Sequence, residues 1–197
     1  MLNIVEYKQL VLKYGSHSSW AIWDYKKESD ASIIGKNFNQ LHSKFVLLAL
    51  NASGSIAKPP WSNFRGGKHD RKLKYACNDT QLRGSYITDI FKDIPEPKSR
   101  KIKSLLTDEI IDKNVSLFNQ EMRDIGINEL TQFIVLGAPN SLLSKYFNNH
   151  FRQNYKNHIT YYYHYSYYRL TDRAWVEGFW KKLGINQNFD LAISKYT

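Results

Sequence analysis

The sequence has one cysteine, five prolines and no long hydrophobic run. Cys77 has no second cysteine to pair with, so no disulfide can form within the chain. No apolar stretch approaches the ~18 residues that a membrane-spanning helix needs. The first residues also lack the basic and then apolar layout of a secretory signal. We therefore expect a cytoplasmic protein that does not associate with a membrane.

Several short enzyme motifs are missing as well. The sequence contains no P-loop, no Gly-x-Gly-x-x-Gly and no Cys-x-x-Cys. His69-Asp70 resembles half of a metal site, but no second His/Asp pair matches it. An aspartate at the start of a helix explains Asp70 more simply. We therefore expect neither a metal ion nor another cofactor.

The composition favours a polyanionic partner. The 197 residues predict one domain spanning 1–197, with a net charge of +10. Aromatic residues make up 15% of the chain and include fourteen tyrosines, whose rings can stack on nucleic-acid bases. Core packing explains most aromatics equally well, and many basic proteins bind no nucleic acid. Composition alone therefore leaves the function open.

Apolar runs and helical spacing alternate along the chain. The apolar runs predict strands at 45–50, 85–91, 132–136 and 158–163. Helical spacing predicts helices at 2–14, 31–42, 69–78, 104–125, 141–151 and 171–183, and two prolines predict a surface loop at 93–103. This alternation indicates an α/β fold: a three-layer α/β/α sandwich with a central, mostly parallel four-stranded sheet.

Polar and aromatic residues follow the predicted strands. In open α/β sheets, ligands bind at the carboxyl ends of the strands. Asn51 ends the first strand, Asp89 lies near the end of the second, and His164 follows the fourth. Phe64 lies on the loop after the first strand. We expect these four side chains to gather at one edge of the sheet.

The order of these features resembles the uracil-DNA glycosylase superfamily, nearer to its mismatch-specific and other divergent branches. Leu48-Ala-Leu-Asn-Ala-Ser53 is similar to the first active-site motif, with asparagine where other branches have aspartate. Phe64 matches the aromatic residue that stacks on the flipped base. His164-Tyr-Ser-Tyr-Tyr-Arg169 is similar to the second motif, and Asp89 falls where a base-reading residue lies. The resemblance spans most of the chain.

The resemblance implies base excision in DNA repair. A monomer would flip uracil, or another deaminated or mismatched base, out of DNA and hydrolyse its N-glycosidic bond without a metal. The catalytic residues would be Asn51, which orients water, and His164, which donates a hydrogen bond to the leaving base. Phe64, Asp89, Ser53 and Trp61 would contact the base. Ser166, Tyr167, Tyr168, Arg169 and Arg65 would contact the DNA.

Other interpretations of these residues stay open. Tyrosines replace both prolines of the usual second motif, and an ionised Asp89 accepts hydrogen bonds only, whereas O4 of uracil needs a donor. Asn51 can bond to its own turn, Phe64 can pack on the core, His164 can be satisfied by backbone and Asp89 can cap an element. The alternative function is a non-catalytic module of the same fold that binds a nucleic acid or nucleotide. A flavodoxin-like enzyme acting on a small molecule is compatible with the fold alone.

Overall fold

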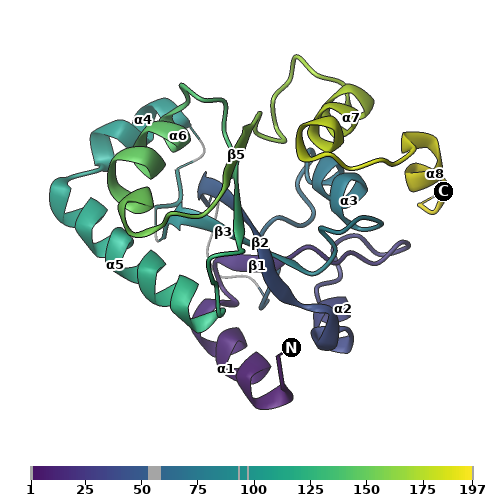
Figure 1. The fold of residues 1–197 in the computed structure, drawn as a ribbon, viewed down its shortest axis with the longest axis horizontal. Helices are drawn as coiled ribbons and strands as arrows, with labels where there is room; N and C mark the ends of the chain where they lie inside the picture. The colour runs from purple at the N-terminus through teal and green to yellow at the C-terminus, as the bar shows by residue number, and fades with distance from the viewer. Residues whose placement is uncertain (1, 53–58, 93, 97, 197) are drawn as a thin grey trace.

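A five-stranded sheet separates two layers of helices in the computed structural model, which describes residues 2–52, 59–92, 94–96 and 98–196 (Figure 1). The strand order is β1-β3-β2-β4-β5. The strands are β1 (Ser18–Trp20), β2 (His42–Asn51), β3 (Ser85–Phe91), β4 (Gln132–Leu136) and β5 (Ile159–Tyr162). β2 to β5 run parallel, and β1 pairs with the outer edge of β3 in the antiparallel direction.

The predicted α/β class is confirmed, but the prediction of four strands is wrong. The additional strand, β1, is only three residues long and is buried throughout. It therefore shows no alternation of buried and exposed residues that could reveal it in the sequence.

Helices and helical turns connect the strands on both faces of the sheet. They are α1 (Ile4–Tyr14), α2 (Ser32–Lys36), the 3-10 turn η1 (Phe38–Gln40), α3 (Arg71–Cys77), α4 (Ser99–Leu105), α5 (Asp108–Asp124), α6 (Leu142–Tyr146), the π turn η2 (Phe147–Phe151), the 3-10 turn η3 (Arg152–Asn154), α7 (Asp172–Leu183) and α8 (Phe189–Ser194). In the described part of the chain, none of them is long and apolar enough to cross a bilayer.

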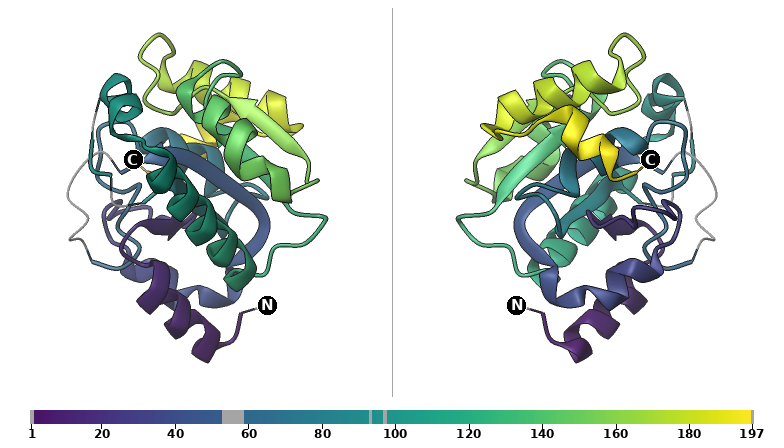
Figure 2. Two further views of the ribbon diagram at one scale, coloured as in Figure 1. Left: turned by 90° about the vertical axis from the view of Figure 1, so that its left-hand side faces the viewer. Right: turned by 90° about the vertical axis from the view of Figure 1, so that its right-hand side faces the viewer.

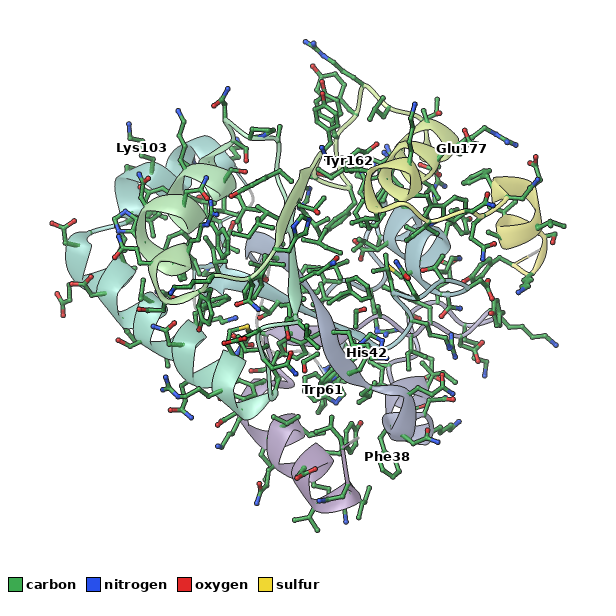
Figure 3. The ribbon with its side chains drawn as sticks, in the orientation of Figure 1. Phe38, His42, Trp61, Lys103, Tyr162 and Glu177 are labelled. Carbon is green, nitrogen blue, oxygen red and sulfur yellow. The ribbon has the colours of Figure 1, made fainter. Side chains whose placement is uncertain are left out.

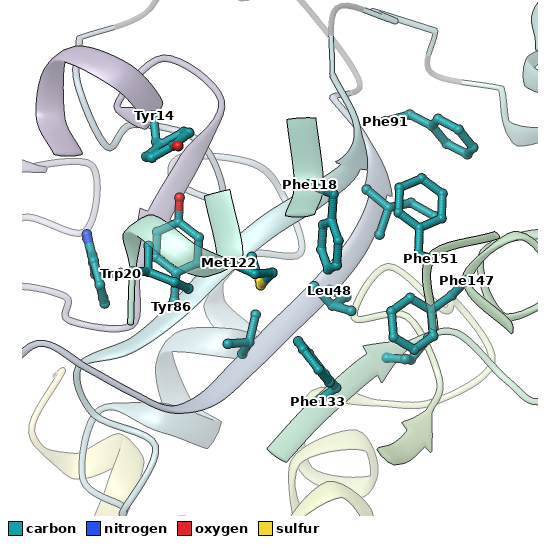
Figure 4. Packing of buried hydrophobic residues seen from close by; sticks show 14 of the residues in the cluster. Tyr14, Trp20, Leu48, Tyr86, Phe91, Phe118, Met122, Phe133, Phe147 and Phe151 are labelled. Atoms are coloured by element: carbon teal, nitrogen blue, oxygen red, sulfur yellow. The ribbon is translucent and has the colours of Figure 1, made fainter. Parts of the chain in front are cut away.

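Successive residues of β2 belong to two separate cores. Val46 and Leu48 pack with the helices α1, α5 and α6, whereas Leu47 and Ala49 pack with α3, α7 and α8. Figure 2 shows α5 on one side of the sheet and α7 and α8 on the other. In the first core, Leu48 lies among Phe118, Phe133 and other rings that meet edge to face (Figure 4). Both faces of the strand are therefore covered, as the continuous apolar run predicts.

A charged pair lies inside the first core. Lys92 Nζ lies 2.8 Å from Glu121 Oε2, and both side chains are almost fully buried. The other oxygen, Glu121 Oε1, accepts hydrogen bonds from Tyr86 at 2.7 Å and Thr88 at 2.9 Å. These contacts bind α5 to β3 with charge-assisted hydrogen bonds.

Two predicted helices are interrupted in the structure. The predicted helix 104–125 is divided into α4 and α5 because Leu106 and Thr107 are extended, and the Thr107 hydroxyl accepts a hydrogen bond from the amide of Ile110. Part of the predicted loop 93–103 is accordingly helical. The predicted helix 31–42 is divided into α2 and η1, and helix α8 was not predicted.

Candidate functional site

One cavity of about 780 Å³ opens at the carboxyl ends of the parallel strands. This edge lies at the top of Figure 1, and α6 and the loop before α7 both contribute residues to the cavity. Asn51, Phe64, Asp89 and His164 all line the cavity, together with Ser166, Tyr167 and Tyr168. The structure therefore brings the predicted catalytic pair, a predicted stacking ring and a predicted base-reading residue to one place. Ser53 lies outside the described residues.

The side chain of Asn51 is fixed by the backbone around it. Its Nδ2 donates to the carbonyl oxygens of Ala52 at 2.9 Å, Ile94 at 2.7 Å and Glu96 at 2.9 Å. Because all three partners are acceptors, the amide can have only one orientation. The amide nitrogen is therefore occupied, and Oδ1 is the atom of Asn51 that can accept a hydrogen bond from a water molecule or a ligand.

Phe64 lies on a loop with an uncommon backbone geometry. Phe64 and Trp61 have φ values of 62° and 64°, in the left-handed region that residues other than glycine seldom occupy. Such strain persists only where surrounding contacts hold it. Here the Trp61 amide donates to the Gly15 carbonyl at 2.7 Å, and Asn63 Nδ2 donates to the His17 carbonyl at 2.9 Å. These contacts therefore hold Phe64 at the cavity wall, where the residue is 5% exposed and packs with the second core.

Arg65 has a different position from the one predicted. It is buried, and its guanidinium donates to the carbonyl oxygens of Trp61 at 3.1 Å, Trp20 at 3.0 Å and Ile22. Burial lowers the pKa of Arg65 to about 10. The side chain is thus occupied in holding the Phe64 loop and cannot reach a phosphate, so its assignment as a DNA contact is wrong.

Trp61 also lies away from the cavity. Its side chain is buried against α1 in the first core, where Nε1 donates to the Tyr7 hydroxyl at 3.2 Å. Figure 3 shows Trp61 low in the view, far from Tyr162 near the top. It is not among the residues that line the cavity, so its assignment as a base contact is wrong as well. Its φ above zero turns the chain so that Phe64 can reach the site.

Asp89 forms part of the cavity wall at the end of β3. It is 2% exposed, and its Oδ2 accepts a hydrogen bond from Asn63 Nδ2 at 2.9 Å. The same Asn63 nitrogen donates to the His17 carbonyl. Asp89 is therefore held by a neighbouring cavity residue, and this bond links the end of β3 to the loop that carries Phe64.

The hydrogen bonds of His164 define its tautomer. The amide of Ser166 donates to His164 Nδ1 at 3.2 Å, and the Ser166 hydroxyl lies 2.7 Å from the same nitrogen. Because Nδ1 accepts, the proton of the neutral ring is on Nε2. Burial, and to a smaller extent the nearby His69 and Lys72, lower the pKa of His164 to about 4. At neutral pH the ring is therefore an uncharged donor that can offer its Nε2 proton to a ligand.

The loop after β5 forms an aromatic rim. The rings of Tyr163 and Tyr167 stack with centroids 4.8 Å apart at 10°, and Tyr168 is 78% exposed. The Arg169 guanidinium lies 5.7 Å from the Tyr168 ring; Arg169 is exposed but does not line the cavity. From α3, Lys72 Nζ donates to the carbonyl oxygens of Tyr167 and Leu170 and so fixes the rim.

Tyr165 and Asn63 line the cavity but were not among the predicted site residues. Tyr165 replaces a proline of the second motif. Its ring centroid lies 4.1 Å from the ring centroid of His164 and 6.4 Å from that of Phe64. Burial raises the pKa of Tyr165 well above its usual value, and the charges of Asp70 and Asp89 raise it further. Asn63 was missed because nothing in a loop sequence identifies the residue that will hold a buried carboxylate.

In the described residues, no group of three or more His, Cys, Asp or Glu side chains is positioned to hold a metal ion. Comparison with models of protein families, with curated proteins and with solved structures finds no match to this chain.

Proposed function

We propose that the protein is a DNA glycosylase-like enzyme that takes a flipped base into the cavity and hydrolyses its N-glycosidic bond. One observation carries the proposal: a neutral His164 with its proton on Nε2 shares a cavity with the Asn51 side chain and the Phe64 ring. The cavity volume of about 780 Å³ lies within the range of about 300–1,000 Å³ that small-ligand sites have. The cavity is therefore large enough for a single nucleotide.

The chemistry follows from the three side chains. Phe64 would stack on the base, which is worth roughly 1–3 kcal/mol. As the bond between the sugar C1′ and the base breaks, its electron pair stays on the base, and the His164 Nε2 proton stabilises the developing charge. Asn51 Oδ1 would accept a hydrogen bond from the water that adds to C1′. Asn51 cannot remove a proton, so the water loses its proton to solvent after the sugar cation has formed.

The rim would hold the DNA around the flipped nucleotide. Tyr168 projects into solvent and can enter the gap that the base leaves, as apolar and aromatic wedges do in other proteins that unstack DNA. Arg169 lies beside it and can contact a phosphate. Lys103 lies on the same upper edge of the molecule (Figure 3), and the net charge of +10 favours approach to DNA. The described residues of one chain include the three side chains that the proposed chemistry uses, and we propose that the protein acts as a monomer.

The test is base release from oligonucleotide duplexes. Duplexes that contain uracil, hypoxanthine, xanthine, oxidised guanine or mismatches are incubated with excess protein and then treated with alkali, which cleaves abasic sites. We expect cleavage with at least one duplex and a loss of at least 100-fold in rate for Asn51→Ala or His164→Ala. Equal rates for the wild type and both variants, or no product with any duplex, would contradict the proposal.

A non-catalytic module that binds nucleic acid is the second candidate. The observation that favours it is Asn51 itself, whose amide nitrogen holds the loop that includes Ile94 and Glu96 and which has no carboxylate to activate water. Such a module would bind an abasic duplex with an affinity that falls with salt. Unchanged affinity for Asn51→Ala, together with no base release, would favour this second function.

A further inference from the structure

Three exposed lysines lie on or beside the short helix α4. Lys98 directly precedes this helix, and Lys101 and Lys103 belong to it; we call the three the α4 lysines. None of them forms an ion pair with an acidic residue in the described part of the chain, whereas other exposed cations do, such as Lys13 with Asp124 at 2.8 Å. Their charge is therefore not neutralised within the protein and can attract an anionic partner.

Hydrogen bonds connect α4 to the candidate site. Glu96 lines the cavity, and the carbonyl oxygens of Ile94 and Glu96 accept hydrogen bonds from Asn51 Nδ2. The Glu96 carboxylate in turn accepts a hydrogen bond from the backbone amide of Lys98 at 2.8 Å. These bonds run from Asn51 to the residue before α4, so they hold the α4 lysines at the edge of the cavity.

The aromatic rim flanks the cavity on the other side. Helix α4 follows β3, the rim follows β5, and the strands β2 and β4 lie between them. Three spacings between neighbouring strands separate the two loops by about 14 Å where they leave the sheet. Figure 1 shows α4 and the loop before α7 at the same upper edge, on opposite sides of β5. A DNA strand rises about 3.4 Å per nucleotide, so this separation corresponds to about four nucleotides.

We infer that the α4 lysines bind backbone phosphates about four nucleotides away from the phosphate at Arg169. The inference rests on the proposed function, because the flipped nucleotide and Arg169 define the path of the DNA. The substrate would then be an internal nucleotide of a strand that continues past the cavity on both sides. A lysine ammonium group is a point charge that does not read base edges, so α4 would add affinity for any sequence.

The experiment compares two variants that lose the same charge. The α4 variant carries Lys98→Gln, Lys101→Gln and Lys103→Gln. The control variant carries three substitutions of exposed lysines on α1, α2 and the first half of β2, at the end of the molecule opposite the cavity (Figure 1): Lys8→Gln, Lys36→Gln and Lys44→Gln. Circular dichroism verifies that both variants are folded.

Binding and base release are measured separately. Fluorescence anisotropy follows the binding of a duplex with an unpaired base over a series of salt concentrations. Two shorter duplexes end beside the unpaired base, one on its 5′ side and the other on its 3′ side. Base release is measured with the modified duplexes described above.

We expect the slope of log K against log salt concentration to fall by about 2 to 3 for the α4 variant, since each phosphate contact contributes about 0.9, and to stay unchanged for the control variant. Loss of one flank of the duplex should weaken binding to the wild type by about 10-fold or more and leave binding to the α4 variant unchanged. Loss of the other flank should weaken binding to both proteins.

Equal slopes for the two variants, or wild-type binding that neither shortened duplex weakens, would overturn the inference. If the slope follows the α4 lysines but no duplex releases a base, the inference holds and the proposed hydrolysis is wrong. If a base is released while the α4 variant keeps the wild-type slope, hydrolysis stands and the inference is wrong. No binding of any duplex at low salt would overturn both.

Discussion

His164 should make the stability of the protein depend on pH in a defined window. Its pKa in the folded protein is lowered from 6.5 to about 4, first by burial and then by His69 and Lys72. Between these two pKa values the unfolded chain binds a proton that the folded protein does not. Acid therefore favours unfolding, and the contribution of His164 to stability is present above pH 6.5 and is lost as the pH falls towards 4.

The magnitude follows from the size of the shift. One pKa unit corresponds to about 1.4 kcal/mol, so His164 should account for a loss of about 2 to 3 kcal/mol between about pH 7 and pH 4.5. His164→Gln has no titrating ring and should lose that much less over the same range. The exposed His158 provides the control, since His158→Gln keeps the ring of His164 and should follow the wild type.

Urea unfolding of the three proteins at several pH values measures the difference directly. Parallel pH profiles for the wild type and His164→Gln would refute the assignment of a neutral ring. NMR of the histidine ring nitrogens gives an independent result. We expect the Nε2–H tautomer to persist at about pH 5, where an ordinary histidine is protonated. A protonated His164 ring at that pH would refute the assignment as well.

Other substitutions test other parts of the structure. Phe64→Ala should weaken binding of a duplex with an unpaired base by about 10- to 100-fold in fluorescence anisotropy, because it removes a stacking surface worth roughly 1–3 kcal/mol. Arg65→Met should lower the free energy of unfolding by about 2–4 kcal/mol, because it removes the donor to three buried carbonyl groups. Arg65→Met should leave the dependence of DNA binding on salt unchanged. Arg169→Ala should instead reduce the slope of log K against log salt concentration by about 1 and leave the free energy of unfolding unchanged. Lys92→Met should cost about 3–5 kcal/mol in urea unfolding because it leaves Glu121 buried without its cation, and adding Glu121→Leu should recover much of the loss.

The apolar runs of the sequence were sufficient to predict the parallel strands. The strands at 85–91 and 132–136 have the predicted bounds, because both segments are rich in aromatic and β-branched residues. Strand β1 could not be predicted in this way, since its three residues owe their conformation to pairing with Tyr86, Ile87 and Thr88. Long-range pairing of this kind leaves no local pattern.

Three residues of the site could be predicted from the positions of the parallel strands. Asn51, Asp89 and His164 follow or end parallel strands, and the carboxyl ends of such strands share an edge. Loop residues were less predictable: Trp61 and Arg65 neighbour Phe64 in the sequence, but the left-handed turns at Trp61 and Phe64 direct them into the interior. A residue close in sequence to a site residue therefore need not line the site where the backbone reverses direction between them.

Release of a free base tests the central claim most directly. Mass spectrometry of the solution after incubation with a duplex that contains oxidised guanine detects the base without any chemical cleavage step. We predict one free base for each abasic site that forms, with release by His164→Ala at least 100-fold slower than by the wild type. No free base from this or any other duplex at excess protein, or equal release by His164→Ala, would contradict the claim that the cavity hydrolyses an N-glycosidic bond.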